Sequence, residues 1–229
     1  MTSETALITG ASSGIGLELA KCFAAEGCRL VLVARNTLAL ECLAEELRRR
    51  HKIEVRMLPA DLAHPDSPAR IFAELKSAGI EVDVLVNNAG FGAHGNFADL
   101  PLPRQLDIVQ VNVNALVNLT GLFLPGLIAR RCGGVLNIAS TAAHQPGPRM
   151  AVYYATKAFV LSFGEAIAEE LKGSGVTVTT VCPGPTKTNF GTVANFRGSD
   201  NLLRAAMSAE VVACQGHRAF RRGRVVYIN

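Results

Sequence analysis

Tryptophan is absent from the 229-residue chain, and only 6% of its residues are aromatic. Because 49% of the residues are hydrophobic and only 18% are charged, the chain can still bury a large core, built mainly from Leu, Val, Ile and Ala. The length suits one domain, and the sequence contains no internal repeat and no linker. We therefore expect a single domain over residues 1–229.

Several other features that would indicate a function are missing. The net charge is only +4, and the two basic clusters, Arg48–Arg50 and Arg218–Arg224, lack the interleaved aromatics of a nucleic-acid surface. The five histidines have no ligand spacing, so we expect no metal site. No signal peptide opens the chain, and no apolar run reaches the length of a membrane span. We therefore expect a cytoplasmic protein without a membrane span or a nucleic-acid partner.

None of the six cysteines occurs in a Cys-x-x-Cys pair. Each lies in an apolar or helical context. This usage is typical of reduced, mostly buried thiols. The cysteines are Cys22, Cys28, Cys42, Cys132, Cys182 and Cys214.

A glycine-rich turn follows the first apolar run, Ala6–Ile8, and precedes a helical pattern that begins at Leu17. Glycines allow a tight turn and a close approach of backbone to ligand, and the free N–H groups of a helix start suit an anion. The spacing is Gly-x-x-x-Gly-x-Gly, not the Gly-x-Gly-x-x-Gly of the general dinucleotide fingerprint. A purely structural turn is the alternative, but the position after the first strand favours phosphate binding. The residues concerned are Gly10, Ser12, Ser13, Gly14, Ile15 and Gly16.

The end of the second predicted strand, Arg29–Val33, bears on the choice of cofactor. Dinucleotide-binding units often place a carboxylate there to bond the ribose 2′-hydroxyl. Here Ala34, Arg35 and Asn36 occupy that place, with no acid. Arg35 can clamp a 2′-phosphate through its planar guanidinium. The sequence therefore favours NADP(H) over NAD(H), with an ordinary surface arginine as the alternative.

Predicted strands and helices alternate along the rest of the chain. The further strands are Ile53–Leu58, Val82–Val86, Gly133–Ile138, Val176–Val181 and Arg224–Ile228. The further helices are Thr37–Arg50, Pro65–Gly79, Arg104–Arg131, Tyr153–Lys172 and Ala205–Arg221. This alternation predicts an α/β fold with a parallel sheet that helices cover on both faces.

Polar and small residues follow several of these strands. Asp61 and Leu62 come after the third strand, the run Asn88-Ala89-Gly90 comes after the fourth, and Ser140 follows the fifth by one residue. Ligands of such sheets bind beyond the carboxyl ends of the strands. We therefore expect these residues to lie at one edge of the sheet with Gly10 and Arg35.

Tyr153 and Lys157 stand four residues apart at the start of an Ala-rich helical pattern. Positions i and i+4 share one face of a helix. A cation beside a phenol favours the phenolate, so we expect the pKa of Tyr153 to fall below its usual value near 10. A tyrosine tuned in this way can exchange a proton near neutral pH. A surface contact without function is the alternative for the pair alone.

Together these motifs resemble a short-chain dehydrogenase/reductase of the compact type. They occur in the family's order and approximate spacing across nearly the whole chain: Thr9–Gly16, Asp61, Asn87–Gly90, Asn112, Ser140, Tyr153-x-x-x-Lys157, and Pro183-Gly184 with Thr188. The resemblance implies a single Rossmann-type, doubly wound parallel sheet of about seven strands in the order 3-2-1-4-5-6-7. It also implies a homodimer or homotetramer formed through the helices at 104–131 and 153–172.

The resemblance further implies an enzyme that interconverts a carbonyl and a secondary alcohol by hydride transfer. Tyr153 would be the general acid in reduction and the base in oxidation, and Ser140 would hold the substrate oxygen. Lys157 would bond the nicotinamide ribose and lower the pKa of Tyr153, and Asn112 would hold a water linking Lys157 to solvent. Hydroxyl donors placed where negative charge develops on oxygen stabilise the transition state more than the ground state.

For the cofactor, the resemblance adds contacts from Pro183, Gly184, Thr186 and Thr188 to those of the glycine-rich turn, Tyr153 and Lys157. The chain departs from the family at two points. Ser12-Ser13 stands where NADP-preferring relatives often carry a second basic residue, and Thr186 replaces the usual Val or Ile.

The substrate pocket is expected to be formed by loops near the catalytic residues. Residues 186–205 are expected to form a mobile substrate flap. His144 has a solvent-facing alternative, and Tyr154 diverges from Tyr153 and is expected to pack. The substrate remains open among a 3-oxoacyl thioester, a steroid-like ketone, a sugar and a small ketone. The expected lining residues are Phe91, His94, His144, Gln145, Met150 and Phe190, with Tyr154 and Phe196 beside them.

Two other functions remain as alternatives. A non-catalytic NADP(H)-binding regulator or redox sensor would keep the glycine-rich turn but usually lose the four catalytic residues, and all four are present here. A sugar epimerase or dehydratase of the extended type would carry a larger C-terminal domain, whereas forty-five residues follow Gly184.

Overall fold

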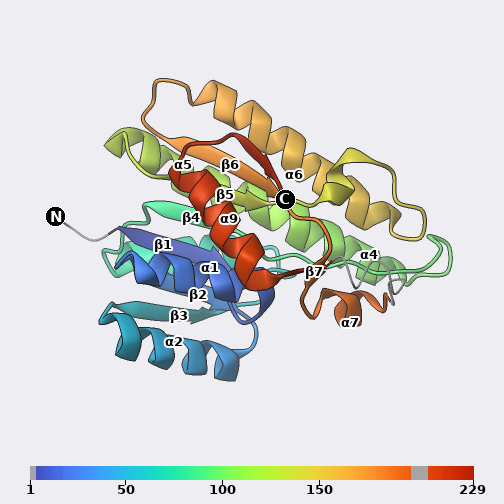
Figure 1. Cartoon of the computed structure of the whole chain (residues 1–229), viewed down its shortest axis with the longest axis horizontal. Helices are drawn as coiled ribbons and strands as arrows, with labels where there is room; N and C mark the ends of the chain where they lie inside the picture. Colours follow the sequence, from blue (N-terminus) through green and yellow to red (C-terminus); the bar gives the residue numbers. More distant parts are fainter. Residues whose placement is uncertain (1–3, 197–205) are drawn as a thin grey trace.

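The computed structural model describes residues 4–196 and 206–229, and its centre is a parallel sheet (Figure 1). Within these residues the sheet has seven strands in the order β3-β2-β1-β4-β5-β6-β9, each parallel to its neighbour. The predicted fold class and strand order are thereby confirmed. The strands are β1 (Thr5–Thr9), β2 (Arg29–Ala34), β3 (Val55–Pro59), β4 (Val84–Asn87), β5 (Gly134–Ile138), β6 (Thr177–Cys182) and β9 (Val226–Ile228).

Helices connect the strands and cover both faces of the sheet. A second, two-stranded pair joins β7 (Thr186–Lys187) to β8 (Met207–Ser208). The long helices are α1 (Gly14–Ala25), α2 (Thr37–His51), α3 (Ser67–Ser77), α4 (Leu102–Val109), α5 (Ala115–Arg130), α6 (Ala151–Glu170) and α9 (Ala209–Arg221). The short elements are the π-helix η1 (Gln110–Asn114), the 3-10 helix η2 (Thr141–His144) and α7 (Phe190–Ala194).

The alternation of side chains along each strand divides the core into two layers. In β1, Ala6 and Ile8 face the layer under α1, α2 and α9, whereas Leu7 faces the layer under α3, α5 and α6. Figure 1 shows α1, α2 and α9 side by side over one face of the sheet. Complete burial of a side chain such as Leu7 contributes about 2 kcal/mol. Both faces are apolar, which is why the strands read as nearly continuous hydrophobic runs.

The predicted helix over Arg104–Arg131 differs from the structure in one respect. It begins at Leu102, and a π-helical turn, Gln110–Asn114, separates its two α-helical halves. By length and composition, Leu102–Arg130 is the one stretch among the described residues that would suffice to cross a membrane, and 44% of its most apolar window is buried within the molecule. The expectation that no apolar stretch reaches this length was therefore wrong. A buried core helix has the same composition, and Leu119 of this helix is buried under the sheet.

The segment predicted as a flap, 186–205, contains β7 and α7 in its described part. Its residues 197–205 lie outside the described residues. The last helix starts at Ala209, not at Ala205, because the Ser208 hydroxyl caps it by accepting a hydrogen bond from the Val211 N–H at 3.2 Å. Movement of the flap stays a prediction.

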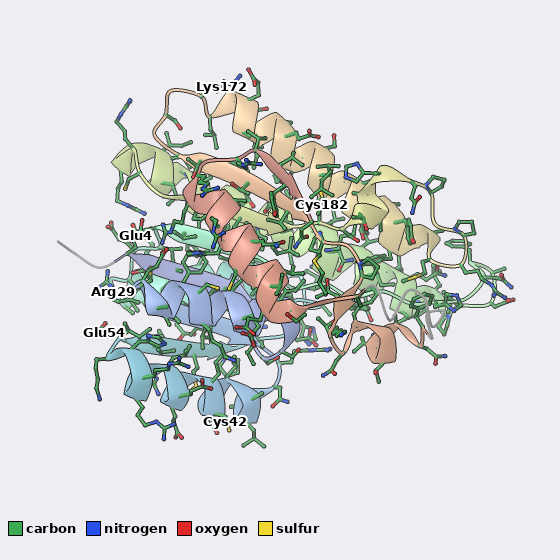
Figure 2. All side chains as sticks on the ribbon, in the orientation of Figure 1. Glu4, Arg29, Cys42, Glu54, Lys172 and Cys182 are labelled. Atoms are coloured by element: carbon green, nitrogen blue, oxygen red, sulfur yellow. The ribbon has the colours of Figure 1, made fainter. Side chains whose placement is uncertain are left out.

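The cysteines do not follow the expected pattern of burial. Cys28 and Cys182 are buried and Cys22 is half-buried, but the other three are exposed. Figure 2 shows Cys42 on the outer side of α2 and Cys182 inside the molecule. The expectation of mostly buried thiols was wrong because these three cysteines lie on the outer sides of helices or at a helix end. The exposed cysteines are Cys42, Cys132 and Cys214.

Candidate active site

A cleft of about 1000 Å³ opens at the carboxyl edge of the sheet. It receives residues from the glycine-rich turn after β1, from the ends of β2 to β6 and from the start of α6. Most of the residues predicted for the site lie together in its wall. These are Gly10, Ser12, Ser13, Gly14, Ile15, Arg35, Asp61, Leu62, Asn88, Ala89, Gly90, Phe91, His94, Ser140, Gln145, Met150, Tyr153, Lys157, Pro183, Gly184, Thr186, Thr188 and Phe190.

The glycine-rich turn requires its glycines for two separate reasons. Gly10 and Gly14 have φ values of +67° and +57°, a region that other residues enter at a cost. Gly16 lies behind the turn, where an added Cβ would collide with the carbonyl oxygen of Gly10. Gly16 therefore lets α1 approach the turn closely. The N-terminus of α1 then faces the cleft, with Ser13 as its N-cap residue.

Thr9 connects the glycine-rich turn to β4, the neighbouring strand in the sheet. This role was not predicted for it. Its hydroxyl donates to the carbonyl oxygen of Val86 at 3.1 Å and accepts from the N–H groups of Asn88 and Ala89, both at 3.0 Å. The Asn88 side chain returns a 2.8 Å hydrogen bond to the Thr9 carbonyl oxygen. The only signal in the sequence is that Thr9 ends a strand directly before Gly10.

Arg35 and Asp61 face each other at the far end of the cleft. Arg35 Nη1 lies 3.9 Å from Asp61 Oδ2, and the Arg35 side chain is 69% exposed. The other carboxylate oxygen of Asp61 accepts a hydrogen bond from the Ala63 N–H at 3.0 Å, which fixes its orientation. The guanidinium of Arg35 therefore stays accessible at the place where β2 ends.

The residues predicted to be catalytic lie at the end of the cleft between β5 and α6. Ser140 follows β5, and its hydroxyl accepts a hydrogen bond from the Ala142 N–H at 3.1 Å as it caps η2. The same hydroxyl donates to the Pro183 carbonyl oxygen at 3.5 Å, and it is near enough to Tyr153 to favour the phenolate form of that residue. The side chains of Ser140, Tyr153 and Lys157 are all part of the cleft wall, as the sequence predicted.

The expected fall in the pKa of Tyr153 is not found. Burial of the phenol raises the pKa of Tyr153 from 10.0 to about 12, and the nearby Ser140 hydroxyl offsets only part of this effect. The Lys157 ammonium lies over the Tyr153 ring, 5.9 Å from its centroid, which is near the outer limit of a cation–π contact. The prediction of a lowered Tyr153 pKa was wrong because it considered the charge of Lys157 but not the burial of the Tyr153 hydroxyl.

Lys157 is itself buried, with only 6% of its surface exposed. Its Nζ atom donates a 2.7 Å hydrogen bond to the carbonyl oxygen of Ile138. Burial lowers the pKa of Lys157 from 10.5 to about 8. The side chain is therefore held by the end of β5 rather than by solvent.

Asn112 lies in the π-helical turn and clamps the chain after β4. Its Oδ1 atom accepts from the Phe91 N–H at 3.1 Å, and its Nδ2 atom donates to the Phe91 carbonyl oxygen and to Thr156 Oγ1, both at 3.0 Å. An added Cβ on Gly90 would lie 3.1 Å from Asn112 Oδ1 and 3.3 Å from Lys157 Nζ. Asn112 thus lies behind the cleft wall, and its partner Thr156 was not among the residues predicted for the site.

Aromatic and apolar side chains surround the Tyr153 ring on the side toward α7. The rings of Tyr153 and Phe190 lie 4.9 Å apart. An added Cβ on Gly92 would meet Phe190 at 3.0 Å, Met150 at 3.1 Å and Tyr153 at 3.2 Å. The side chain of His94 lies against Phe196, with 5.2 Å between ring centroids. This end of the cleft is narrow and mainly apolar.

The remaining predicted pocket residues occupy different positions. His144 is exposed on η2 and lies outside the cleft wall, in agreement with its solvent-facing alternative. Tyr154 packs over Gly147, where an added side chain would collide with its ring, and it also lines the cleft.

Arg104 was not predicted for the site but contacts one of its residues. The guanidinium of Arg104 lies 4.2 Å above the Phe91 ring, and its Nη2 atom donates to the Val193 carbonyl oxygen at 3.2 Å.

The family to which the chain belongs follows from its sequence and fold together. Residues 4–196 match the family model described as short chain dehydrogenase. The chain belongs to this family of oxidoreductases, as its motifs indicated.

Several proteins are similar over most of the chain. A very-long-chain 3-oxoacyl-CoA reductase of Coprinopsis cinerea is 36% identical over 178 residues, which cover 77% of this chain and 52% of the relative. The chain thus spans about half the length of that relative. A short-chain dehydrogenase from Sphingobium yanoikuyae, solved in complex with NADPH, is 34% identical with a TM-score of 0.91, over 98% of this chain and 87% of the other. A bulky-bulky ketone specific alcohol dehydrogenase from Comamonas testosteroni is 31% identical with a TM-score of 0.87, over 100% of this chain and 86% of the other.

Proposed function

We propose that this chain is an NADP(H)-dependent oxidoreductase that interconverts a carbonyl and a secondary alcohol. The observation that carries the proposal is that Ser140 and Tyr153 line one wall of the cleft together with Lys157, which lies one turn beyond Tyr153 on α6. These groups share one cleft with a glycine-rich turn at a helix N-terminus. That combination joins a proton donor to a place for a bound phosphate.

Each catalytic residue has a proposed task. Tyr153 gives its proton to the carbonyl oxygen in reduction and removes it from the alcohol in oxidation. The Ser140 hydroxyl holds that oxygen, Lys157 bonds the ribose of the nicotinamide nucleoside, and Asn112 holds a water that links Lys157 to solvent. The cofactor, when bound, supplies the hydride, and the protein supplies orientation and the proton.

Residues of the cleft wall can contact each part of a bound dinucleotide. The glycine-rich turn and the first turn of α1 would hold the pyrophosphate, which is the use that the positive φ of Gly10 and Gly14 supports. Asp61, Leu62 and Asn88–Gly90 would contact the adenosine and the ribose, and Pro183, Gly184, Thr186 and Thr188 the nicotinamide end. All of these residues line the cleft.

Arg35 supports NADP(H) as the cofactor. It is accessible in the cleft wall at the end of β2, where dinucleotide sites that prefer NAD(H) carry an acid. A guanidinium there can pair with a 2′-phosphate. The NADPH complex of the Sphingobium yanoikuyae relative points the same way.

The lining of the cleft favours a ketone flanked by apolar groups. Met150 and Phe190 lie beside the Tyr153 ring around Gly92, and Phe91 lines the same cleft. A sugar would leave several hydroxyls without partners there, at a cost for each. Two relatives are named for a very-long-chain 3-oxoacyl-CoA and for bulky-bulky ketones, and these names support a ketone as the substrate class.

We also propose a homodimer or homotetramer that uses α5 and α6. Three large apolar side chains are exposed on these helices: Val117 by 37%, Ile128 by 40% and Phe159 by 40%. Phe159 stacks on Phe163, with ring centroids 5.7 Å apart, which forms an aromatic ridge. A monomer in light scattering at micromolar concentration would contradict this assembly. A single domain and a cytoplasmic location stay predictions.

The test of the proposed function is the oxidation of NADPH and NADH with a panel of ketones and sugars. We expect turnover with NADPH and apolar ketones, and at least about 10-fold lower kcat/KM with sugars of similar size. Tight NADPH binding without turnover on any carbonyl compound would instead favour the regulator or sensor.

A further inference from the structure

Two cysteines far apart in the sequence meet where α1 packs against α9. The Sγ atoms of Cys22 and Cys214 lie 3.6 Å apart, across 192 residues of chain. Cys22 is half-buried and Cys214 is exposed. Figure 1 shows the two helices side by side over the same face of the sheet. Neither residue takes part in the cleft.

The two sulfurs are close enough that a disulfide requires only a small further approach. A disulfide has an S–S bond of about 2 Å, so the two sulfurs need to approach by roughly 1.5 Å. Rotation of each side chain about χ1 moves its sulfur and can supply an approach of this size. We propose that Cys22 and Cys214 form a reversible disulfide that clamps α9 onto α1.

The reaction needs a two-electron oxidant, for which we name a peroxide. The exposed Cys214 sulfur attacks hydrogen peroxide, the O–O bond breaks, and a sulfenic acid and one water result. Cys22 then attacks that sulfur, the S–OH bond breaks, and a second water leaves as the disulfide forms. Two thiols lose two protons and two electrons in total, and a low-molecular-weight thiol reverses the reaction by exchange.

The order of the two steps follows from the surroundings of Cys22. Burial, together with the hydrogen bond to Cys214, raises the pKa of Cys22 to about 12. The raised pKa keeps Cys22 as the less reactive thiol toward an oxidant in solution. Toward a sulfenic acid on Cys214, 3.6 Å away, proximity compensates for the low thiolate fraction. The more accessible Cys214 is therefore the residue that peroxide reaches, and Cys22 resolves the product.

The clamp would act on elements that frame the cleft. The glycine-rich turn leads into α1, and α9 follows directly after β8, whose Met207 and Ser208 pair with Thr186 and Lys187 of β7. A link between the two helices thus restrains the segment carrying Thr186 against the helix that faces the cofactor phosphates. Because it also closes a very long loop in the unfolded chain, the link should stabilise the fold.

The test is a peptide map of the full-length protein after treatment with hydrogen peroxide, without reduction. Tryptic peptides 22–29 and 205–218 should appear joined, about 2 Da lighter than their sum, and separate again after a thiol is added. Because peptide 22–29 also contains Cys28, the variants Cys22→Ser, Cys28→Ser and Cys214→Ser are compared. We expect the link to persist in Cys28→Ser and to vanish in the other two.

A second measurement reports on the clamp itself. Oxidised wild-type protein should melt roughly 5 °C or more above the reduced protein, and the variant Cys42→Ser, which lacks an exposed thiol on α2, should show the same rise. Cys22→Ser and Cys214→Ser should show no rise. Absence of the 22–214 link, a link that survives in Cys22→Ser, cross-links between chains alone, or an unchanged Tm would each overturn the proposal.

Discussion

The ammonium of Lys157 donates a hydrogen bond of 2.7 Å to the carbonyl oxygen of Ile138, at the last residue of β5. This bond ties the first half of α6 to the strand that leads into Ser140. It positions Lys157 from inside the protein, because this side chain is only 6% exposed. The hydrogen bond between α6 and β5 thus fixes the part of α6 from which Tyr153 and Lys157 point into the cleft.

Burial of Lys157 predicts a particular dependence of stability on pH. The pKa of Lys157 is lowered from 10.5 to about 8 in the folded state. Between these values the unfolded chain binds the additional proton, so the free energy of unfolding rises with pH across this window. The rise amounts to at most about 3 kcal/mol. Below pH 8 the burial penalty is present in full.

Urea unfolding of wild type and Lys157→Met from neutral to alkaline pH checks this prediction. The stability of wild type relative to Lys157→Met should increase between pH 8 and 10.5, the interval between the two pKa values. Lys172→Met, which removes a 71% exposed lysine beyond the end of the same helix, is the matched control and should show no such trend. A constant difference between wild type and Lys157→Met would contradict the lowered pKa.

Removal of the Arg35 guanidinium should weaken NADPH use selectively. Arg35→Gln deletes the cation at the end of β2, and a charged hydrogen bond to phosphate contributes roughly 1.5–3 kcal/mol, or about 10- to 100-fold in kcat/KM. The kcat/KM for NADH should change less than about 3-fold. Arg49→Gln, at the exposed end of α2, is the control. Equal losses of kcat/KM with NADPH and NADH in Arg35→Gln would show that Arg35 does not bind the 2′-phosphate.

Gly92 should set the size of ketone that fits beside Tyr153. In Gly92→Ala the new methyl group lies 3.0–3.2 Å from Phe190, Met150 and Tyr153, closer than an ordinary contact. We expect kcat/KM for bulky ketones to fall by about 10-fold or more relative to small ones, and Phe190→Ala to shift the ratio the other way. Gly121→Ala, on α5 with open space around it, is the control. A parallel loss for all ketones would contradict this role.

The two directions of the reaction should differ in their response to pH. Because burial raises the pKa of Tyr153 to about 12, the phenol is protonated and ready to act as an acid at neutral pH. Oxidation of the alcohol requires the phenolate, so it should reach its optimum at higher pH than reduction. Initial rates in both directions between about pH 6 and pH 10 measure this. Coincident optima, or a more acidic optimum for oxidation, would contradict the assignment of Tyr153.

The sequence was sufficient to predict the sheet and most of the cleft wall. Strands such as Ala6–Ile8 are continuous apolar runs between turn residues, and each is followed by a helix, which leaves few topologies. Because a parallel sheet brings every carboxyl end to one edge, Gly10, Arg35, Asp61 and Ser140 could be assigned to one site from their order alone.

Features that depend on packing in three dimensions could not be predicted. The π-helical turn that turns Asn112 toward Phe91 leaves no mark in the hydrophobic periodicity. The pKa of Tyr153 depends on how deeply its hydroxyl is buried, which the i, i+4 spacing does not contain. Cys22 and Cys214 are 192 residues apart in the sequence, and they lie close together only because α1 packs against α9.

The central claim is that Tyr153 exchanges the proton during the reaction. The most direct measurement compares NADPH-dependent ketone reduction by wild type, Tyr153→Phe and Tyr227→Phe, with NADPH binding measured in each. Tyr227 lies in β9, outside the cleft wall, so its variant removes a hydroxyl elsewhere. We predict that Tyr153→Phe binds NADPH normally but loses about 10²- to 10⁴-fold in kcat, while Tyr227→Phe keeps its activity. Equal kcat values for Tyr153→Phe and wild type would contradict the account.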